Sequence, residues 1–395
     1  MRAWVLAAAV AFSFSWAGFV SAQPNPEFIR VAVVENDVQA DLQIFGRFTI
    51  RTLQNGDAVH EGRRLPSVAI KAMPQGIAIG ENVLPYAGVR IDPASDAAIS
   101  LNGTRLRGSL EIVRQQGLKL LIVNDVSVED YLRGVLSKEA PDYWPEEALK
   151  AIAIAARTYA VYQRFSKEKS TYDVMGTVMS QDYGGKTAEK SATTRAVKAT
   201  ADLIIMYRDG IFPAFYHSTC GGVPTENGRV MGKFDVPSLQ GGVTCNFCTA
   251  SPFYHWRRRL TKADIAWALK KSRYGSIGTI RDMRVTQRTL SGRVQEMTVF
   301  GSRRALRLTG YDARALFGFE RIRSPAFDVL NIAEGFVLDG HGWGHGVGLC
   351  QWGAAELARR GATAEEILQM YYPGSRLVAV KELVNQTIVV IGGKT

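Results

Sequence analysis

The periodicity of the apolar residues changes part-way along the chain. Before residue 124, short segments alternate apolar and polar residues, as in Phe28 to Val34 and Leu118 to Val123, and Gly, Pro and Asn-Gly turns separate them. After residue 144, apolar residues recur at helical spacing at Leu149, Ile152 and Ala156. This order restricts the chain to an α+β fold, in which a β-rich N-terminal region precedes a mixed α/β core.

The length of 395 residues leaves room for two or three domains, at about 100 to 200 residues each. We predict a β-rich N-terminal region at 23–107, a core domain at 108–376 and a C-terminal strand or tail at 377–395. Between Thr261 and Gly318 the pattern changes to a helix, three strand-like segments and a second helix. Residues 261–318 are therefore predicted to be an inserted α/β subdomain.

The first 22 residues have the pattern of a secretory signal. Arg2 is followed by an apolar run from Ala3 to Val20, and the small residues Ser21 and Ala22 fit a signal-peptidase site. The alternative is a membrane anchor that is retained, because the run reaches the ~18 residues that a span needs. On the first reading the protein is exported, and it touches the membrane only if this segment is kept.

The chain carries a formal net charge of +11, and removing Arg2 with the signal leaves +10. Such a charge favours an anionic partner. No basic run with interleaved aromatic residues and no nucleic-acid motif is visible, so we expect no nucleic-acid partner. For an exported protein, the anionic polymer that fits is the bacterial cell wall.

Glu139 is the carboxylate that we single out as a candidate acid. Two prolines and the aromatic residues Tyr143 and Trp144 follow it closely, and aromatic rings of this kind can stack on a sugar. A carboxylic acid donates a proton at neutral pH when apolar surroundings raise its pKa. The alternative is a surface carboxylate that pairs with Lys138 or Arg133.

Four blocks of sequence follow one another in order along residues 108 to 376. They are 126–160, Ser180-Gln181-Asp182-Tyr183-Gly184-Gly185, Tyr216-His217-Ser218-Thr219-Cys220-Gly221-Gly222, and 342–354, which contains Gly342-Trp343-Gly344-His345-Gly346-Val347-Gly348 and Gln351-Trp352-Gly353-Ala354. Together these blocks resemble the signature of the sporulation protein D (SpoIID) family, which includes the LytB amidase enhancers. The first block contains Glu139 at the position of the family's glutamate.

This resemblance implies a lytic transglycosylase that cleaves peptidoglycan glycan strands, preferably strands already stripped of their stem peptides. Glu139 would be the single acid/base. A hydrolase would need a second carboxylate, and Asp142, Glu146, Asp182 and Glu226 are available. Two other classes stay open: a non-catalytic activator that binds an N-acetylmuramoyl-L-alanine amidase, and a purely structural wall-binding module.

The matching blocks also supply candidates for contact with the glycan. The glycine-alternating block 341–348 either leaves a surface along which a polymer can lie or packs closely against a neighbouring strand. Arg157 is an alternative case, because an arginine on a helix can instead anchor the core through a buried ion pair. The candidates are Tyr143, Trp144, Arg157, Gln181, Ser218, Trp343, His345 and Gln351.

The cysteine spacing predicts either one structural zinc ion or a disulfide. His217-x-x-Cys220 and Cys245-x-x-Cys248 form two pairs that can chelate one tetrahedral ion. In an exported protein, Cys220 can instead form a disulfide with Cys245 or Cys248. Cys350 is expected to be a buried thiol outside this set.

Overall fold

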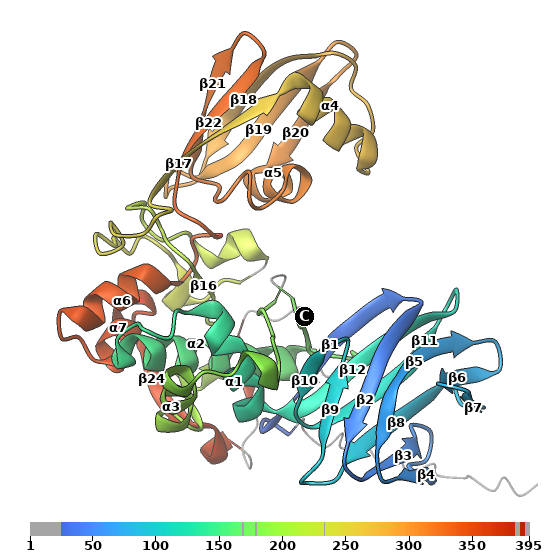
Figure 1. Cartoon of the computed structure of the whole chain (residues 1–395). Helices are drawn as coiled ribbons and strands as arrows, with labels where there is room; N and C mark the ends of the chain where they lie inside the picture. Colours follow the sequence, from blue (N-terminus) through green and yellow to red (C-terminus); the bar gives the residue numbers. More distant parts are fainter. Residues whose placement is uncertain (1–24, 168–169, 178–179, 233, 384–387, 392–395) are drawn as a thin grey trace, which may run out of the picture.

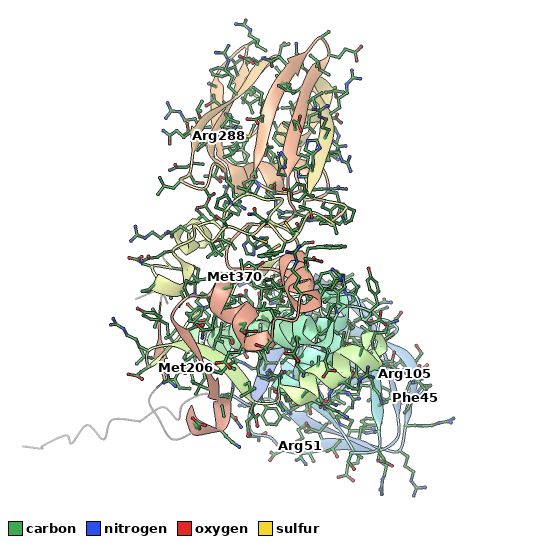
Figure 2. All side chains as sticks on the ribbon, turned by 90° about the vertical axis from the view of Figure 1, so that its left-hand side faces the viewer. Phe45, Arg51, Arg105, Met206, Arg288 and Met370 are labelled. Atoms are coloured by element: carbon green, nitrogen blue, oxygen red, sulfur yellow. The ribbon has the colours of Figure 1, made fainter. Side chains whose placement is uncertain are left out.

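A computed structural model describes residues 25–167, 170–177, 180–232, 234–383 and 388–391. It contains a β-sandwich, a helix-rich centre and an insertion that stands away from both (Figure 1). The predicted signal peptide at 1–22 lies outside the described residues. No helix in the described part of the chain is long and apolar enough to cross a membrane. In Figure 2, Phe45 and Arg105 mark the sandwich, Met206 and Met370 the centre, and Arg288 the insertion.

Two antiparallel sheets form the N-terminal sandwich, with one addition from later in the chain. The first sheet has the strand order β13-β1-β12-β11-β8-β3-β4. Its strands are β1 (Phe28–Asp37), β3 (Phe48–Thr52), β4 (Ala58–Gly62), β8 (Gly88–Pro93), β11 (Ser109–Gln115), β12 (Lys119–Ser127) and the parallel β13 (Val174–Met175). The second sheet has the order β10-β9-β2-β5-β6-β7. Its strands are β2 (Gln39–Phe45), β5 (Leu65–Met73), β6 (Gly76–Ile79), β7 (Asn82–Leu84), β9 (Ala98–Leu101) and β10 (Thr104–Leu106).

Helix α2 (Glu146–Ser166) lies at the middle of the helix-rich centre and is buried along most of its length. Its alanines have small side chains, so neighbouring elements can approach closely. Around it pack α1 (Val128–Glu139), α3 (Ser191–Ala199), α6 (Gln351–Arg359) and α7 (Ala364–Tyr371). The strands here are β14 (Leu203–Tyr207), β15 (Gly210–Ile211), β24 (Ser375–Ala379) and β25 (Val389–Val390) in one sheet, and β16 (Tyr216–His217) paired with β23 (Leu349–Cys350) in another. Short 3-10 turns are η1 (Lys186–Ala188), η2 (Gly228–Met231), η3 (Pro237–Leu239) and η4 (Val380–Leu383).

The insertion has a hydrophobic core of its own, with buried residues from Trp256 to Leu338. Two three-stranded sheets enclose this core, in the orders β17-β22-β21 and β18-β19-β20. The elements are β17 (His255–Thr261), α4 (Lys262–Lys271), β18 (Ile280–Arg288), β19 (Val294–Gly301), β20 (Ala305–Thr309), α5 (Gly310–Phe317), β21 (Phe327–Ile332) and β22 (Gly335–His341).

The α+β class and the β-rich N-terminal region are confirmed, whereas the domain boundaries move. The insertion extends beyond 261–318, because β17, β21 and β22 hydrogen-bond to one another inside it. The boundary at 107/108 cuts a sheet, because β8 pairs with β11 and β1 pairs with β12. The C-terminal tail predicted from 377 begins inside β24, which pairs with β14 of the centre. All three boundaries depend on pairing between strands that are distant in the sequence, and local sequence patterns do not indicate such pairing.

Candidate functional site

The local sequence places Glu139 at the C-terminal end of helix α1. Ser127 caps the other end, where its hydroxyl accepts a hydrogen bond from the Asp130 N–H at 3.1 Å. At Ala140 the backbone turns extended (φ −139°, ψ 139°), because Pro141 disfavours helical geometry in the residue before it. The helix therefore stops at Glu139, and its negative dipole end lies at this carboxyl group.

Two neutral groups hold the Glu139 carboxylate. Its Oε1 accepts from the Asp182 backbone N–H at 3.2 Å, and its Oε2 accepts from the Gln351 amide at 3.3 Å. The cations considered as surface partners are engaged elsewhere: Lys138 pairs with Asp182 at 3.3 Å, and Arg133 pairs with Asp130 at 2.9 Å. Glu139 is therefore not the surface ion pair that was the alternative for this residue.

The surroundings of Glu139 raise the pKa of its carboxyl group. Loss of solvation is the largest cause, and the nearby Asp182 charge adds to it. The hydrogen bonds from the Asp182 N–H and the Gln351 amide act in the opposite direction, as does the charge of Lys138. A carboxyl group with a raised pKa holds a proton closer to neutral pH, which suits a general acid.

Three further polar side chains surround the carboxyl group. Gln181 is buried, and it accepts from the Tyr131 hydroxyl at 3.0 Å and donates to the Tyr216 hydroxyl at 2.9 Å. Burial raises the pKa of both tyrosines, and the charge of Glu139 raises it further. The sequence-based site did not include Tyr131 or Tyr216, although both lie in the matching blocks.

The raised pKa of Glu139 predicts a pH-dependent cost in stability. Below about pH 4.5, the ordinary value for this carboxyl group, folded and unfolded chains both carry the proton. As the pH rises through the raised folded pKa, the ionised carboxylate destabilises the folded chain. Glu139→Gln should therefore unfold at a higher temperature than the unsubstituted protein at pH 7, and the difference should disappear below about pH 4.5.

Thermal unfolding followed by circular dichroism from pH 4 to 8 measures this difference. Glu81→Gln is the control, because Glu81 is exposed in the turn between β6 and β7. The control should show no such change with pH. A constant difference between Glu139→Gln and the unsubstituted protein over the whole range would contradict the pKa shift.

Of the aromatic residues predicted to contact a sugar, the two next to Glu139 differ in exposure. Tyr143 is 74% exposed, so its ring is free to stack on a ligand. Trp144 is 5% exposed and packs edge-to-face on Trp352 with ring centroids 5.4 Å apart. The prediction for Trp144 is therefore corrected, because its ring belongs to the core.

Arg157 and Gln181 are corrected in the same way. Arg157 is 1% exposed and forms an ion pair with Glu129 at 2.7 Å, and it also donates to backbone carbonyls of α3 and β14. It is the buried anchor that was its alternative reading. Gln181 is also 1% exposed, and its amide bonds are used within the protein. Neither side chain can reach a bound polymer, although Gln181 positions the tyrosines beside Glu139.

The glycine block at 341–348 packs closely against β16. Gly342, Gly344, Gly346 and Gly348 all have positive φ. A Cβ at Gly344 would lie 2.6 Å from the Cβ of His217. The second interpretation of this block, close packing against a neighbouring strand, is the one that the structure supports.

The projecting residues of this block differ in their surroundings. Trp343 is half-buried against Phe253 and Arg323, whose Cζ lies 5.0 Å from the Trp343 ring centroid. His345 packs against the rings of Phe215 and His217. Burial holds the pKa of His345 well below its usual range, so the imidazole is neutral. Ser218 is partly exposed, and its backbone carbonyl accepts a hydrogen bond from the Trp352 N–H at 3.1 Å.

Four thiols gather where β16, β23 and the start of α6 meet. The Sγ atoms of Cys220, Cys245, Cys248 and Cys350 all lie within 4.8 Å of one another, and none of these cysteines is in a disulfide. The Cys220 and Cys248 sulfurs are 3.3 Å apart. Tetrahedral zinc with bonds of about 2.3 Å separates its sulfurs by about 3.8 Å. The cluster therefore has the size and the donor set of a four-thiolate zinc site.

The donors around these sulfurs also fit thiolate ligands. Cys350 Sγ accepts from the N–H groups of Cys220 and Gly353, each at 3.3 Å. Cys245 Sγ accepts from the Tyr371 hydroxyl at 3.1 Å. Hydrogen bonds to the sulfurs stabilise their charged form. A side chain at position 353 would collide with this cluster, since its Cβ would lie 2.6 Å from Cys245 Sγ.

The predicted ligand set is corrected at one position. His217 lies outside the cluster, where its Nδ1 is 3.2 Å from the Val347 carbonyl. Burial lowers its pKa to about 3, so the ring is neutral. Cys350 is the fourth thiol of the cluster, whereas the sequence predicts a buried thiol outside this set. The sequence around Cys350 does not indicate that this thiol joins the cluster, because only the pairing of β16 with β23 brings Cys350 to Cys220.

The fold and the site together define a class of protein. It is a mixed α+β chain that holds a partly buried carboxyl group with a raised pKa, Glu139, suited to general acid–base chemistry, and a cluster of four thiols next to the helix start that contacts it. Residues 116–207, which include Glu139, match the family model for the stage II sporulation protein SpoIID. Residues 243–348 match the model of a domain of unknown function, DUF8618.

Curated relatives agree with this match. An uncharacterized protein of Brachyspira hyodysenteriae is 28% identical over 360 residues, which cover 90% of this chain and 94% of that protein. Stage II sporulation protein D of Bacillus subtilis is 28% identical over 315 residues, which cover 75% of this chain and 86% of that protein. The amidase enhancer of Bacillus subtilis is 27% identical over 346 residues, which cover 76% of this chain and 48% of that protein. Residues 116–207 thus match the SpoIID family model, and the named relatives agree with the resemblance that the sequence motifs indicate.

Proposed function

We propose that this protein is an exported lytic transglycosylase that cleaves the glycan strands of peptidoglycan, with Glu139 as its single acid/base. One observation carries the proposal: Glu139 ends a helix, is partly buried with a poorly solvated carboxyl group, and accepts hydrogen bonds from two neutral donors. Loss of solvation and the C-terminal end of the helix favour the protonated carboxyl group that the first step needs, whereas the two hydrogen bonds favour the carboxylate and orient it; the net effect is a raised pKa.

In the first step, the protonated Glu139 gives its proton to the oxygen between N-acetylmuramic acid and N-acetylglucosamine, and the bond from that oxygen to C1 breaks. The carboxylate then accepts the proton of the C6 hydroxyl of the muramic residue, whose oxygen bonds to C1. The products are a 1,6-anhydro sugar and a free strand end, and Glu139 regains its proton. The Asp182 N–H and the Gln351 amide keep the carboxyl group oriented in both steps.

A hydrolytic route would need a second carboxylate as base or nucleophile. Glu226 is held by the Thr289 and Ser291 hydroxyls of the insertion. Glu146 pairs with Lys150 at 3.1 Å, and Asp142 is exposed. Among these carboxylates, Asp182 is the one whose charge acts on Glu139. It is therefore the residue with which to separate the two routes.

Asp182→Asn should lower the cleavage rate by less than about tenfold, because it retains the backbone N–H that Glu139 accepts. Mass spectrometry of the products from peptide-free and peptide-bearing glycan should find muramic ends that are one water lighter than hydrolytic ends. Asp142→Asn is the matched control. Reducing ends, together with a loss of about 10³-fold in Asp182→Asn, would make the protein a hydrolase.

A second function is favoured by one comparison. The relative named amidase enhancer matches 76% of this chain. On this reading the protein binds an N-acetylmuramoyl-L-alanine amidase and stimulates it, and Glu139 serves no chemistry. An assay of a purified amidase with and without this protein tests that function independently of glycan cleavage.

We also propose one structural zinc ion bound by Cys220, Cys245, Cys248 and Cys350. Four thiolates close the coordination shell, so the ion would stabilise the fold and leave no position for substrate. Cys350 caps helix α6, and the next residue, Gln351, donates to Glu139. The ion would therefore also hold in place the start of the helix that orients the catalytic carboxyl group.

A further inference from the structure

The positive charge of this chain is concentrated in the insertion. Residues 255–341 contain 17 Lys and Arg against 8 Asp and Glu, which is a net charge of +9, while the whole chain has 48 against 37, or +11. The other 308 residues together therefore carry only +2. Figure 2 shows nitrogen-ended side chains projecting around the insertion. The charge is a property of this one folded unit.

Six exposed cations of the insertion come from segments that meet at one end of it. The loop after α4 and the turn between β19 and β20 lie side by side, because Arg303 N–H donates to the Ile277 carbonyl at 3.1 Å and Ser302 N–H to that of Thr279 at 2.9 Å. Arg304 also donates to the Tyr274 carbonyl. We call this group the basic end; its residues are Lys270, Lys271, Arg273, Arg281, Arg303 and Arg304.

Most of these charges are free to bind a ligand. Among the described residues, Arg273 has a carboxylate partner, Asp312 at 3.5 Å, and the other five have none within 4.0 Å. Elsewhere on the described insertion, the exposed arginines except Arg258 are paired, as Arg257 is with Asp339 at 2.7 Å. Most of the unpaired exposed cations therefore lie at the basic end.

The basic end points away from the catalytic part of the chain. The turn between β18 and β19 is the end of this sheet that contacts the centre, where Ser291 donates to Glu226 at 2.7 Å. Strand β19 then runs for eight residues to the opposite turn, a distance of about 23 Å. A polymer bound at the basic end would thus lie at a different place from the strand at Glu139 (Figure 1).

We propose that the basic end binds the carboxylates of stem peptides on intact peptidoglycan, so that the insertion anchors the enzyme while Glu139 acts on another strand. This inference rests on the proposed function for the identity of the polymer. Fixed cations without partners attract a polymer that bears repeated carboxylates.

The aromatic residues at the basic end favour this ligand over a membrane or a nucleic acid. Trp267 is 63% exposed, but Lys271 Nζ lies 4.3 Å from its ring centroid, and Arg273 Cζ lies 5.0 Å from that of Tyr274. Membrane insertion needs an apolar face, and base stacking needs free aromatic rings. At the basic end, the rings of Trp267 and Tyr274 instead lie against the exposed cations Lys271 and Arg273.

Co-sedimentation with insoluble peptidoglycan tests the proposal. All proteins carry Glu139→Gln, so that no strand is cut during the assay, and the sacculi are freed of phosphate polymers by acid. The test variant is Lys270→Glu/Lys271→Glu/Arg281→Glu/Arg303→Glu. The control variant Arg63→Glu/Arg64→Glu/Lys119→Glu/Lys198→Glu changes the net charge equally at exposed positions outside the insertion.

The parent is the protein with Glu139→Gln alone. At about 0.05 M salt the test variant should bind intact sacculi on the order of tenfold more weakly than this parent, and the affinity of the control variant should stay within about twofold of the parent's. Removing stem peptides with an amidase should weaken binding of the parent about as much, and should then make parent and test variant equal. Equal loss in both variants, no loss in the test variant, or no effect of peptide removal would each overturn the proposal.

Two further ligands complete the test. Tighter binding of the parent to phosphatidylglycerol vesicles or to single-stranded DNA than to sacculi would assign the basic end to a membrane or a nucleic acid, and would overturn the proposal. Cleavage of short soluble glycans by the protein with Glu139 intact is measured separately. If the glycans are not cleaved but binding to sacculi still depends on the basic end, the result counts against the proposed function alone. If the glycans are cleaved but binding does not depend on the basic end, the result counts against the anchor alone.

Discussion

Glu139→Gln should fold normally and should cleave glycan strands more slowly than the unsubstituted protein by about 10³-fold or more. The amide has nearly the same shape as the carboxylic acid but has no proton to transfer. Both steps of the proposed reaction use this one group, so no other residue can compensate. Release of soluble fragments from peptide-free glycan, measured by chromatography with mass detection, gives the rate.

Glu146→Gln is a suitable control, because Glu146 lies seven residues further along and its side chain is 61% exposed. The control should keep its rate within a few-fold. Turnover of Glu139→Gln within a few-fold of the unsubstituted protein would remove Glu139 from the chemistry. If that variant still stimulates a purified amidase, the enhancer function would become the better account.

Removal of the proposed zinc ion should give the second large effect. Purified protein should contain about one zinc per chain, and its thiols should react only after a chelator is added. Loss of a ligand that binds only the folded chain removes its binding free energy from stability. Chelation should therefore lower the melting temperature by about 10 °C, for a loss of about 3 to 4 kcal/mol.

Two substitutions separate the ligand set from its surroundings. Cys350→Ser should lose most of the zinc, whereas His217→Gln should keep it, because His217 lies outside the four thiols. The result expected from the sequence pattern alone is the reverse. Negligible metal in the native protein, with an intact mass two hydrogens below that of the reduced form, would replace the zinc site with a disulfide.

Much of this protein follows from local sequence. Strand and helix periods predict the α+β class, and the Thr363 capping box starts α7 as expected, because caps depend on residues three apart. The end of α1 at Glu139 follows from Pro141 two residues later. The matching blocks identify Glu139 as the candidate acid, because such motifs preserve residue type and spacing.

The tertiary structure decided what depends on residues that are distant in the chain. Glu139 meets Gln351 across 212 positions, and Cys350 reaches Cys220 across 130. Exposure is decided in the same way. Trp144 and Arg157 carry the side chains of a sugar-binding site, yet packing and an ion pair bury them. Local sequence determines which elements form and where they end, but the burial and the partners of a side chain depend on how those elements pack.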